Sequence, residues 1–159
     1  AGRVNVLVVG LESSCTRYVS RLVAANLCDA KDWNAVDRVE GKGHSVTHRS
    51  LPHGPRDNFI SGDAWREYDA VLLACRDYSC SLKSKTGTHQ RDPLKAKSEH
   101  EHGREVMRQL LEGKNAHVWC CEAAFLLGQP YARHVLGLIG IPLTHYLETT
   151  DPNAKYLKG

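Results

Sequence analysis

Residues Val4–Arg17 read VNVLVVGLESSCTR, an apolar run that breaks at Gly10 and continues into a short polar loop. A continuous run of this kind, rich in valine, is typical of a strand buried on both faces. Amphipathic spacing over Tyr18–Leu27 predicts a helix directly after the loop, whose serine and threonine side chains are candidate N-caps. The exposed N–H groups and the dipole at such a helix start attract phosphate or sulfate. We therefore expect this loop to hold the phosphate end of a nucleotide.

The composition is that of one soluble globular domain spanning residues 1–159. Hydrophobic residues make up 42% of the chain and charged residues 25%, both ordinary values. The net charge of +3 suits an anionic ligand but is too small to indicate a nucleic-acid partner. Because no run approaches the roughly 18 apolar residues of a membrane helix, we expect no membrane span. The first residues lack the pattern of a signal peptide.

The six cysteines contain no Cys-x-x-Cys pair. Cys75 and Cys120 lie in apolar runs, where cysteine usually serves as a small buried hydrophobe. We expect free thiols in a reducing compartment, and hence a cytoplasmic protein; an oxidised lumenal protein is the alternative.

Apolar runs and helical periodicity alternate along the chain and predict an α/β domain with a mainly parallel sheet. The expected strands are Val4–Val9, His44–Leu51, Ala70–Cys75 and Ala116–Cys121, and a second long helix is expected over Ser98–Glu112. Four segments are interpreted as largely irregular: Lys31–Gly43, Asn58–Tyr68 (with a short helix), Arg76–Ser84 and Lys85–Lys97, of which the last is the expected mobile segment. Ligands of such sheets bind at the carboxyl ends of the strands. Three polar segments directly follow expected strands, namely the first loop, Arg76–Ser84 and Glu122, so we expect them to meet at one edge of the sheet.

The first loop differs from the ATP-binding Walker pattern. Counting from Gly10, Cys15 occupies the place of the second glycine and Thr16 that of the lysine. The loop length suits a phosphate cradle, whereas the residues that serve ATP and Mg²⁺ are missing. An ordinary ATPase or GTPase is therefore disfavoured.

The loop resembles the phosphosulfate-binding loop of sulfotransferases that use 3′-phosphoadenosine 5′-phosphosulfate (PAPS), which typically reads Lys-Ser-Gly-Thr-Thr. Ser14 and Thr16 match this pattern, while Ser13 stands in place of the lysine, Cys15 in place of the glycine and Arg17 in place of the second threonine. The family also binds the nucleotide 3′-phosphate with an arginine at a strand end and a serine eight residues later. Arg76 and Ser84 have this spacing here.

The resemblance implies a three-layer P-loop NTPase-like sulfotransferase fold, with a mainly parallel central sheet and flanking helices. It implies a cofactor site formed by Ser13, Ser14, Cys15, Thr16, Arg17, Arg76 and Ser84. It further implies transfer of a sulfuryl group from PAPS to a hydroxyl or amine, which leaves adenosine 3′,5′-bisphosphate. Arginine suits this role because its guanidinium is forked and permanently charged.

The transfer needs positioning, a cation on the leaving phosphate and a base for the acceptor proton, but no metal. We expect Arg17 to supply the cation and His48 to act as the base, because a histidine titrates near neutral pH. His44, His53 and Glu122 are the competing bases. The acceptor stays open among a carbohydrate, a small alcohol and a peptide tyrosine.

Two other functions remain open. One is a P-loop-like nucleotide or small-molecule kinase, which requires Mg²⁺ and an acidic ligand at a strand end. The other is a non-catalytic nucleotide-binding or anion-binding module, which Ser13 and Cys15 favour because they depart from the motif of an active loop.

Overall fold

A five-stranded sheet forms the centre of the computed structural model, which describes residues 2–34, 38–51, 64–87, 92–113 and 115–157. Its strand order is β2-β3-β1-β4-β5. The strands are β1 (Asn5–Leu11), β2 (Arg38–Gly41), β3 (His44–Leu51), β4 (Ala70–Cys75) and β5 (Ala116–Cys120). All neighbours run parallel except β2, which forms an antiparallel hairpin with β3 at one edge. The expected α/β class and mainly parallel sheet are confirmed.

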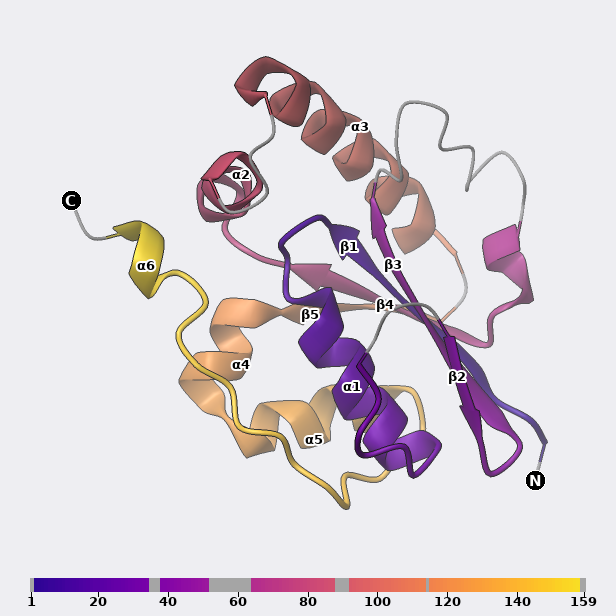
Figure 1. The fold of residues 1–159 in the computed structure, drawn as a ribbon. Helices are drawn as coiled ribbons and strands as arrows, with labels where there is room; N and C mark the ends of the chain where they lie inside the picture. Colours follow the sequence, from indigo (N-terminus) through magenta and orange to yellow (C-terminus); the bar gives the residue numbers. More distant parts are fainter. Residues whose placement is uncertain (1, 35–37, 52–63, 88–91, 114, 158–159) are drawn as a thin grey trace.

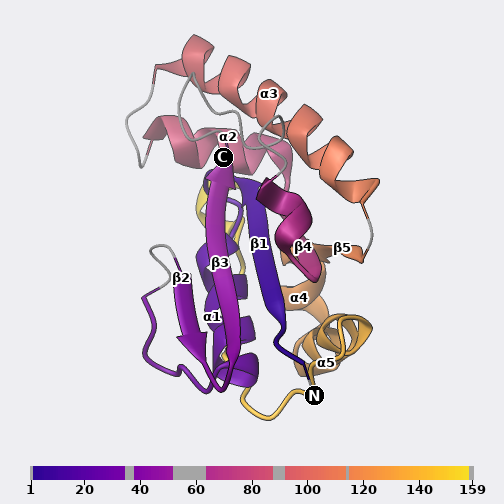
Figure 2. The same cartoon turned by 90° about the vertical axis from the view of Figure 1, so that its right-hand side faces the viewer.

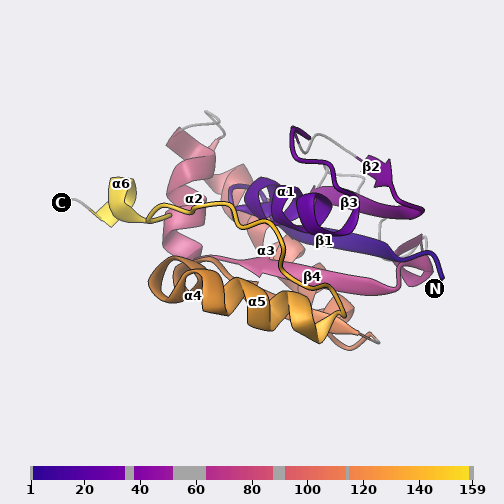
Figure 3. The ribbon, with the colours of Figure 1, turned by 90° about the horizontal axis from the view of Figure 1, so that it is seen from below.

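Helices cover both faces of this sheet (Figure 1). They are α1 (Thr16–Leu27), α2 (Tyr78–Gly87), α3 (Pro93–Leu111), α4 (Cys121–Leu127), α5 (Gln129–Leu138) and α6 (Ala154–Leu157), with a 3₁₀ turn, η1, at Ala64–Glu67. In Figure 1, α1, α4 and α5 lie below the strands and α3 lies above them, so that α1, α4 and α5 face the viewer when the molecule is seen from below in Figure 3. Figure 2 shows α2 and α3 beyond the carboxyl end of β3. No helix within the described residues is long and apolar enough to cross a membrane.

Alternate residues of the strands fill two separate cores, as the period of two in a strand requires. Val6, Val8 and Leu72 point to the face that α1, α4 and α5 cover, where Trp119 is also fully buried. Leu7, Val9, Val71 and Leu73 point to the opposite face and pack against Val106 and Leu110 of α3. The central strand is buried on both faces, which explains its unbroken apolar run.

Gly10 continues β1 rather than ending it, so the expected break at this glycine is wrong. It pairs with Ser50 of β3 and Ala74 of β4. A Cβ at this position would lie 2.6 Å from the carbonyl oxygen of Ala74 and 2.8 Å from Cγ2 of Thr16. The glycine therefore allows the start of α1 to pack closely on the strand.

Three segments expected to be irregular contain regular structure. The edge strand β2 lies within Lys31–Gly43, and its pairing with β3 depends on tertiary contacts that its polar sequence does not reveal. The segment after Arg76 forms α2, and α3 begins at Pro93 rather than Ser98. Asp92 caps α3 by accepting a hydrogen bond from the Lys95 N–H at 3.0 Å.

The expected helix over Ser98–Glu112 is confirmed as part of α3. The short helix expected within Asn58–Tyr68 corresponds to η1. Residues 58–63 of that segment lie outside the described residues. The segment Lys85–Lys97, expected to be mobile, includes the end of α2, which extends to Gly87, and the start of α3 at Pro93. Its residues 88–91 lie outside the described residues.

Candidate anion-binding site

The loop Glu12–Cys15 connects the central strand to α1 in an unusual backbone conformation. Ser13 and Cys15 both adopt the left-handed region, with φ of 67° and 56°. Cys15 is the N-cap residue of α1, and no side chain caps the helix. The expected capping by serine or threonine is therefore wrong. The backbone N–H groups of Glu12 and Ser14 donate to the carbonyl oxygens of Leu51 and Leu11, at 3.2 and 3.1 Å. The donors that this connection can offer an anion therefore lie at the start of α1.

A disulfide between Cys15 and Cys121 fixes this loop to the first residue of α4. Their Cα atoms lie 6.7 Å apart across a sequence separation of 106 residues. The expectation that all cysteines are free thiols is wrong for this pair. Four free cysteines remain, namely Cys28, Cys75, Cys80 and Cys120. The pairing of two among six cysteines cannot be deduced from the sequence.

His48 lies next to the start of α1. Its Nε2 is 2.8 Å from the hydroxyl oxygen of Thr16, so the structure brings the expected base to the expected cofactor loop. His44 is the first residue of the same strand, four residues before His48, and its Nδ1 accepts a hydrogen bond from the N–H of Val4. The third histidine considered, His53, lies outside the described residues.

The two serines of the loop have different surroundings. The hydroxyl of Ser14 is buried and lies 3.3 Å from that of Ser81 on α2. The hydroxyl oxygen of Ser13 is shielded from solvent and makes no hydrogen bond with any described residue. Arg17 is exposed in the first turn of α1.

Arg76 uses each of its guanidinium nitrogens in contacts within the protein. Nη1 donates to the carbonyl oxygen of Ser13 at 2.6 Å, Nε donates to Oδ1 of Asn153 at 3.0 Å, and Nη2 donates to the carbonyl oxygen of Pro152. Its guanidinium carbon also lies 5.1 Å from the ring centre of Tyr156. Arg76 therefore joins the loop to the C-terminal segment.

Glu122 extends this network at the end of β5. Its Oε1 accepts hydrogen bonds from the Asn153 side chain at 2.8 Å and from the backbone N–H of Asp77 at 2.6 Å. Burial raises the pKa of Glu122, but these hydrogen bonds outweigh it and leave the pKa lower than usual. The Glu122 carboxylate thus holds the segment around Asn153 in place through a hydrogen bond. Sequence reasoning missed Asn153, because no motif in the sequence includes it.

Ser84 is not joined to Arg76. It lies buried within α2, and no hydrogen bond connects the two side chains. The eight-residue spacing between Arg76 and Ser84 thus covers the start and the first two turns of α2 and not a loop.

A buried polar cluster lies behind the loop, between α2 and α3. Lys85 is fully buried, and its Nζ lies 2.7 Å from Oε2 of Glu99 and 3.6 Å from Oε2 of Glu12. Beside it, Ser81 donates to the carbonyl oxygen of Glu12 at 3.0 Å and lies 2.8 Å from Nε2 of His100. Burial, followed by the nearby Lys85 charge, lowers the pKa of His100 to about 4, so this histidine is neutral.

No protein-family model, curated protein or solved structure matches the chain. Within the described residues, no three histidine, cysteine or acidic side chains are grouped so as to hold a metal ion.

Proposed function

We propose that this domain binds the phosphate or sulfate end of a nucleotide at the loop Glu12–Cys15 and the first turn of α1. The observation that carries the proposal is the uncapped start of this twelve-residue helix directly after two left-handed residues. The N–H groups of the first turn have no partner within the helix and form a ready site for an anion. The solvent-shielded hydroxyl of Ser13 is a further hydrogen-bond donor in the same loop.

The loop fits the 5′ end of such a nucleotide better than Arg76 and Ser84 fit a second phosphate. The Arg76 nitrogens already donate to Ser13, Pro152 and Asn153. Arg76 therefore supports the loop, and its replacement by alanine would disturb the site even without direct contact to a ligand.

The test compares ligands and one loop variant. Adenosine 3′,5′-bisphosphate without metal is expected to raise Tm by about 5–10 °C at one hundred times its Kd. Ser13→Asp introduces a negative charge into the loop and should abolish this shift. Ser98→Asp adds the same charge at an exposed position of α3 and should leave it unchanged. A shift with ATP and Mg²⁺ alone favours the kinase alternative, and no shift with any nucleotide refutes the proposal.

A second, narrower proposal is sulfuryl transfer from PAPS, which the contact between His48 and Thr16 favours. The acceptor oxygen attacks the sulfur, the bond between sulfur and the phosphate oxygen breaks, and His48 takes the acceptor proton. Adenosine 3′,5′-bisphosphate leaves with the electron pair of the broken bond. The exposed Arg17 is the cation nearest in sequence to the loop and is assigned to the charge on the leaving phosphate.

Transfer from labelled PAPS to carbohydrate, alcohol and tyrosine-peptide acceptors tests this step. His48→Gln is expected to lose turnover while still binding adenosine 3′,5′-bisphosphate, and the exposed His102→Gln is the matched control. Binding without any turnover in the parent protein leaves the domain as a non-catalytic nucleotide-binding module. Equal turnover in His48→Gln removes this histidine as the base.

A further inference from the structure

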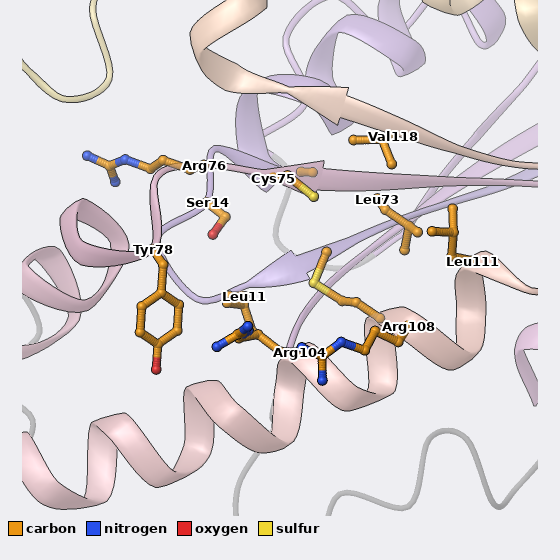
Figure 4. Close-up of a pocket in the computed structure, with 12 residues that line it drawn as sticks. Leu11, Ser14, Leu73, Cys75, Arg76, Tyr78, Arg104, Arg108, Leu111 and Val118 are labelled. Atoms are coloured by element: carbon orange, nitrogen blue, oxygen red, sulfur yellow. The ribbon is translucent and has the colours of Figure 1, made fainter.

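A cavity of about 300 Å³ lies between α3 and the β4–β5 part of the sheet. Leu73 and Val118 form its wall on the sheet, and Leu111 borders it from α3 (Figure 4). Met107 of α3 also lines it. These walls lie on the face of the sheet opposite to α1, and Ser14 of the loop proposed to bind a nucleotide borders the cavity at one end. Most of its surface is apolar, and Val118 and Leu111 remain 42% and 49% exposed at its border.

One end of the cavity carries a positive charge. Arg104 of α3 lies over the ring of Tyr78 from α2, with its guanidinium carbon 5.1 Å from the ring centre. Arg104 forms no ion pair within the described part of the chain, whereas Arg108 on the same helix lies 3.2 Å from Glu105. Arg76 also borders the cavity, but its guanidinium points away from it in Figure 4, toward the partners described above. A single uncompensated cation therefore faces an apolar space.

The Tyr78 ring carries this arginine, while its hydroxyl points toward α3 in Figure 4, away from Leu73 and Val118. The hydroxyl is shielded from solvent and makes no hydrogen bond with any described residue. A carboxylate oxygen beside Arg104 would accept from its guanidinium. Charge-assisted hydrogen bonds of this kind are the stronger ones in proteins.

We propose that this cavity binds a small monocarboxylate with an apolar body, with the carboxylate at Arg104 and the body between Leu73, Met107 and Val118. The volume corresponds to about ten water molecules, and hence to a ligand of roughly ten non-hydrogen atoms, the size of octanoate. The single unpaired arginine matches one negative charge, and the apolar walls exclude a strongly hydrated dianion such as inorganic phosphate. The site does not depend on the proposed nucleotide function.

The test titrates the labelled protein with octanoate and with octanol and follows backbone amide shifts by NMR. Octanoate is expected to shift amides of α3, β4 and β5 and to bind about tenfold more tightly than octanol. Arg104→Gln should remove this tenfold preference, whereas Lys97→Gln, an exposed lysine of the same helix, should preserve it. Tyr78→Phe keeps the ring that Arg104 covers and should preserve it as well.

Leu111→Trp places a larger side chain at the border of the cavity and should block both ligands. Equal binding of octanoate and octanol, an unchanged preference in Arg104→Gln, or amide shifts confined to other elements would each overturn the assignment. Absence of binding at millimolar octanoate would do so as well.

Discussion

Replacing Lys85 with methionine should cost about 3 kcal/mol of unfolding free energy. The side chain is fully buried, and its ammonium lies between the carboxylates of Glu99 and Glu12, at 2.7 and 3.6 Å. Methionine keeps most of the volume but removes the ammonium from its ion pairs with both carboxylates. Removing one partner of a buried ion pair costs about 3–5 kcal/mol, and the lower value applies because each glutamate side chain is 20% exposed.

Equilibrium unfolding in urea, followed by tryptophan fluorescence, measures this loss. With a slope of about 2 kcal/mol per molar urea, the midpoint should fall by about 1.5 M. The corresponding fall in Tm is about 6–12 °C. Lys83→Met is the matched control, because Lys83 is an exposed residue of the same helix and should change stability by less than about 0.5 kcal/mol.

A double variant separates charge from packing. Glu99→Gln in the Lys85→Met background removes the negative charge of one of the two carboxylates that Lys85 pairs with, and it should restore part of the lost stability. If Lys85→Met unfolds within about 1 kcal/mol of the parent protein, or if Glu99→Gln adds a further full loss, the cluster does not act as an ion pair and the reasoning is refuted.

Three further predictions concern pH, the disulfide and a helix cap. The pKa of His100 in the folded protein, about 4, lies below its ordinary value of 6.5, so the unfolded chain binds this proton at a higher pH than the folded protein does. The free energy of unfolding should therefore decrease as the pH falls from about 6.5 toward 4. The urea midpoint of His100→Gln should fall less steeply over that range than the midpoint of the parent protein. Reduction of the Cys15–Cys121 disulfide should lower the free energy of unfolding by about 2–4 kcal/mol. Alkylation of the unfolded protein, read by mass spectrometry, should label four thiols before reduction and six after it, whereas six labelled thiols before reduction would exclude the disulfide. Asp77 accepts hydrogen bonds from the Ser79 hydroxyl and from the Cys80 N–H, at 2.6 and 2.9 Å, and these bonds lower its pKa. Asp77→Ala should therefore cost about 1 kcal/mol at pH 7, and urea unfolding should show this cost shrinking as the pH falls through the lowered pKa.

Local signals in the sequence predicted the inner strands well. Ala70–Cys75 and His44–Leu51 form strands with the predicted bounds, because each is defined by its own apolar or alternating pattern. The strand β2 and the helix α2 were missed for a different reason. The pairing of β2 with β3 and the burial of Lys85 in α2 are set by residues distant in the sequence, and the polar composition of both segments resembles that of a loop.

The candidate site was predictable only in part. The position of the loop followed from the strand–loop–helix pattern, and the choice of His48 as the base followed from its ordinary pKa. Its closeness to Thr16 results from the parallel pairing of β1 with β3. The contacts of Arg76 with the loop and with Asn153 could not be predicted from the sequence, because a guanidinium donates to backbone carbonyls as readily as to phosphate. The two residues that supply those carbonyls, Ser13 and Pro152, lie 63 and 76 residues away in the sequence.

Cys15 allows a final test of whether loop shape or the disulfide controls the proposed anion site. A non-glycine residue in the left-handed conformation carries a cost of about 1–2 kcal/mol that glycine avoids. Cys15→Gly and Cys121→Ala both remove the disulfide, but only the first relieves this cost. Cys15→Gly should therefore unfold at a urea concentration higher by about 0.5 M than Cys121→Ala and should retain the thermal shift with adenosine 3′,5′-bisphosphate. If the glycine variant is the less stable of the two, or loses the shift that the alanine variant keeps, the backbone conformation at Cys15 is not what forms the site.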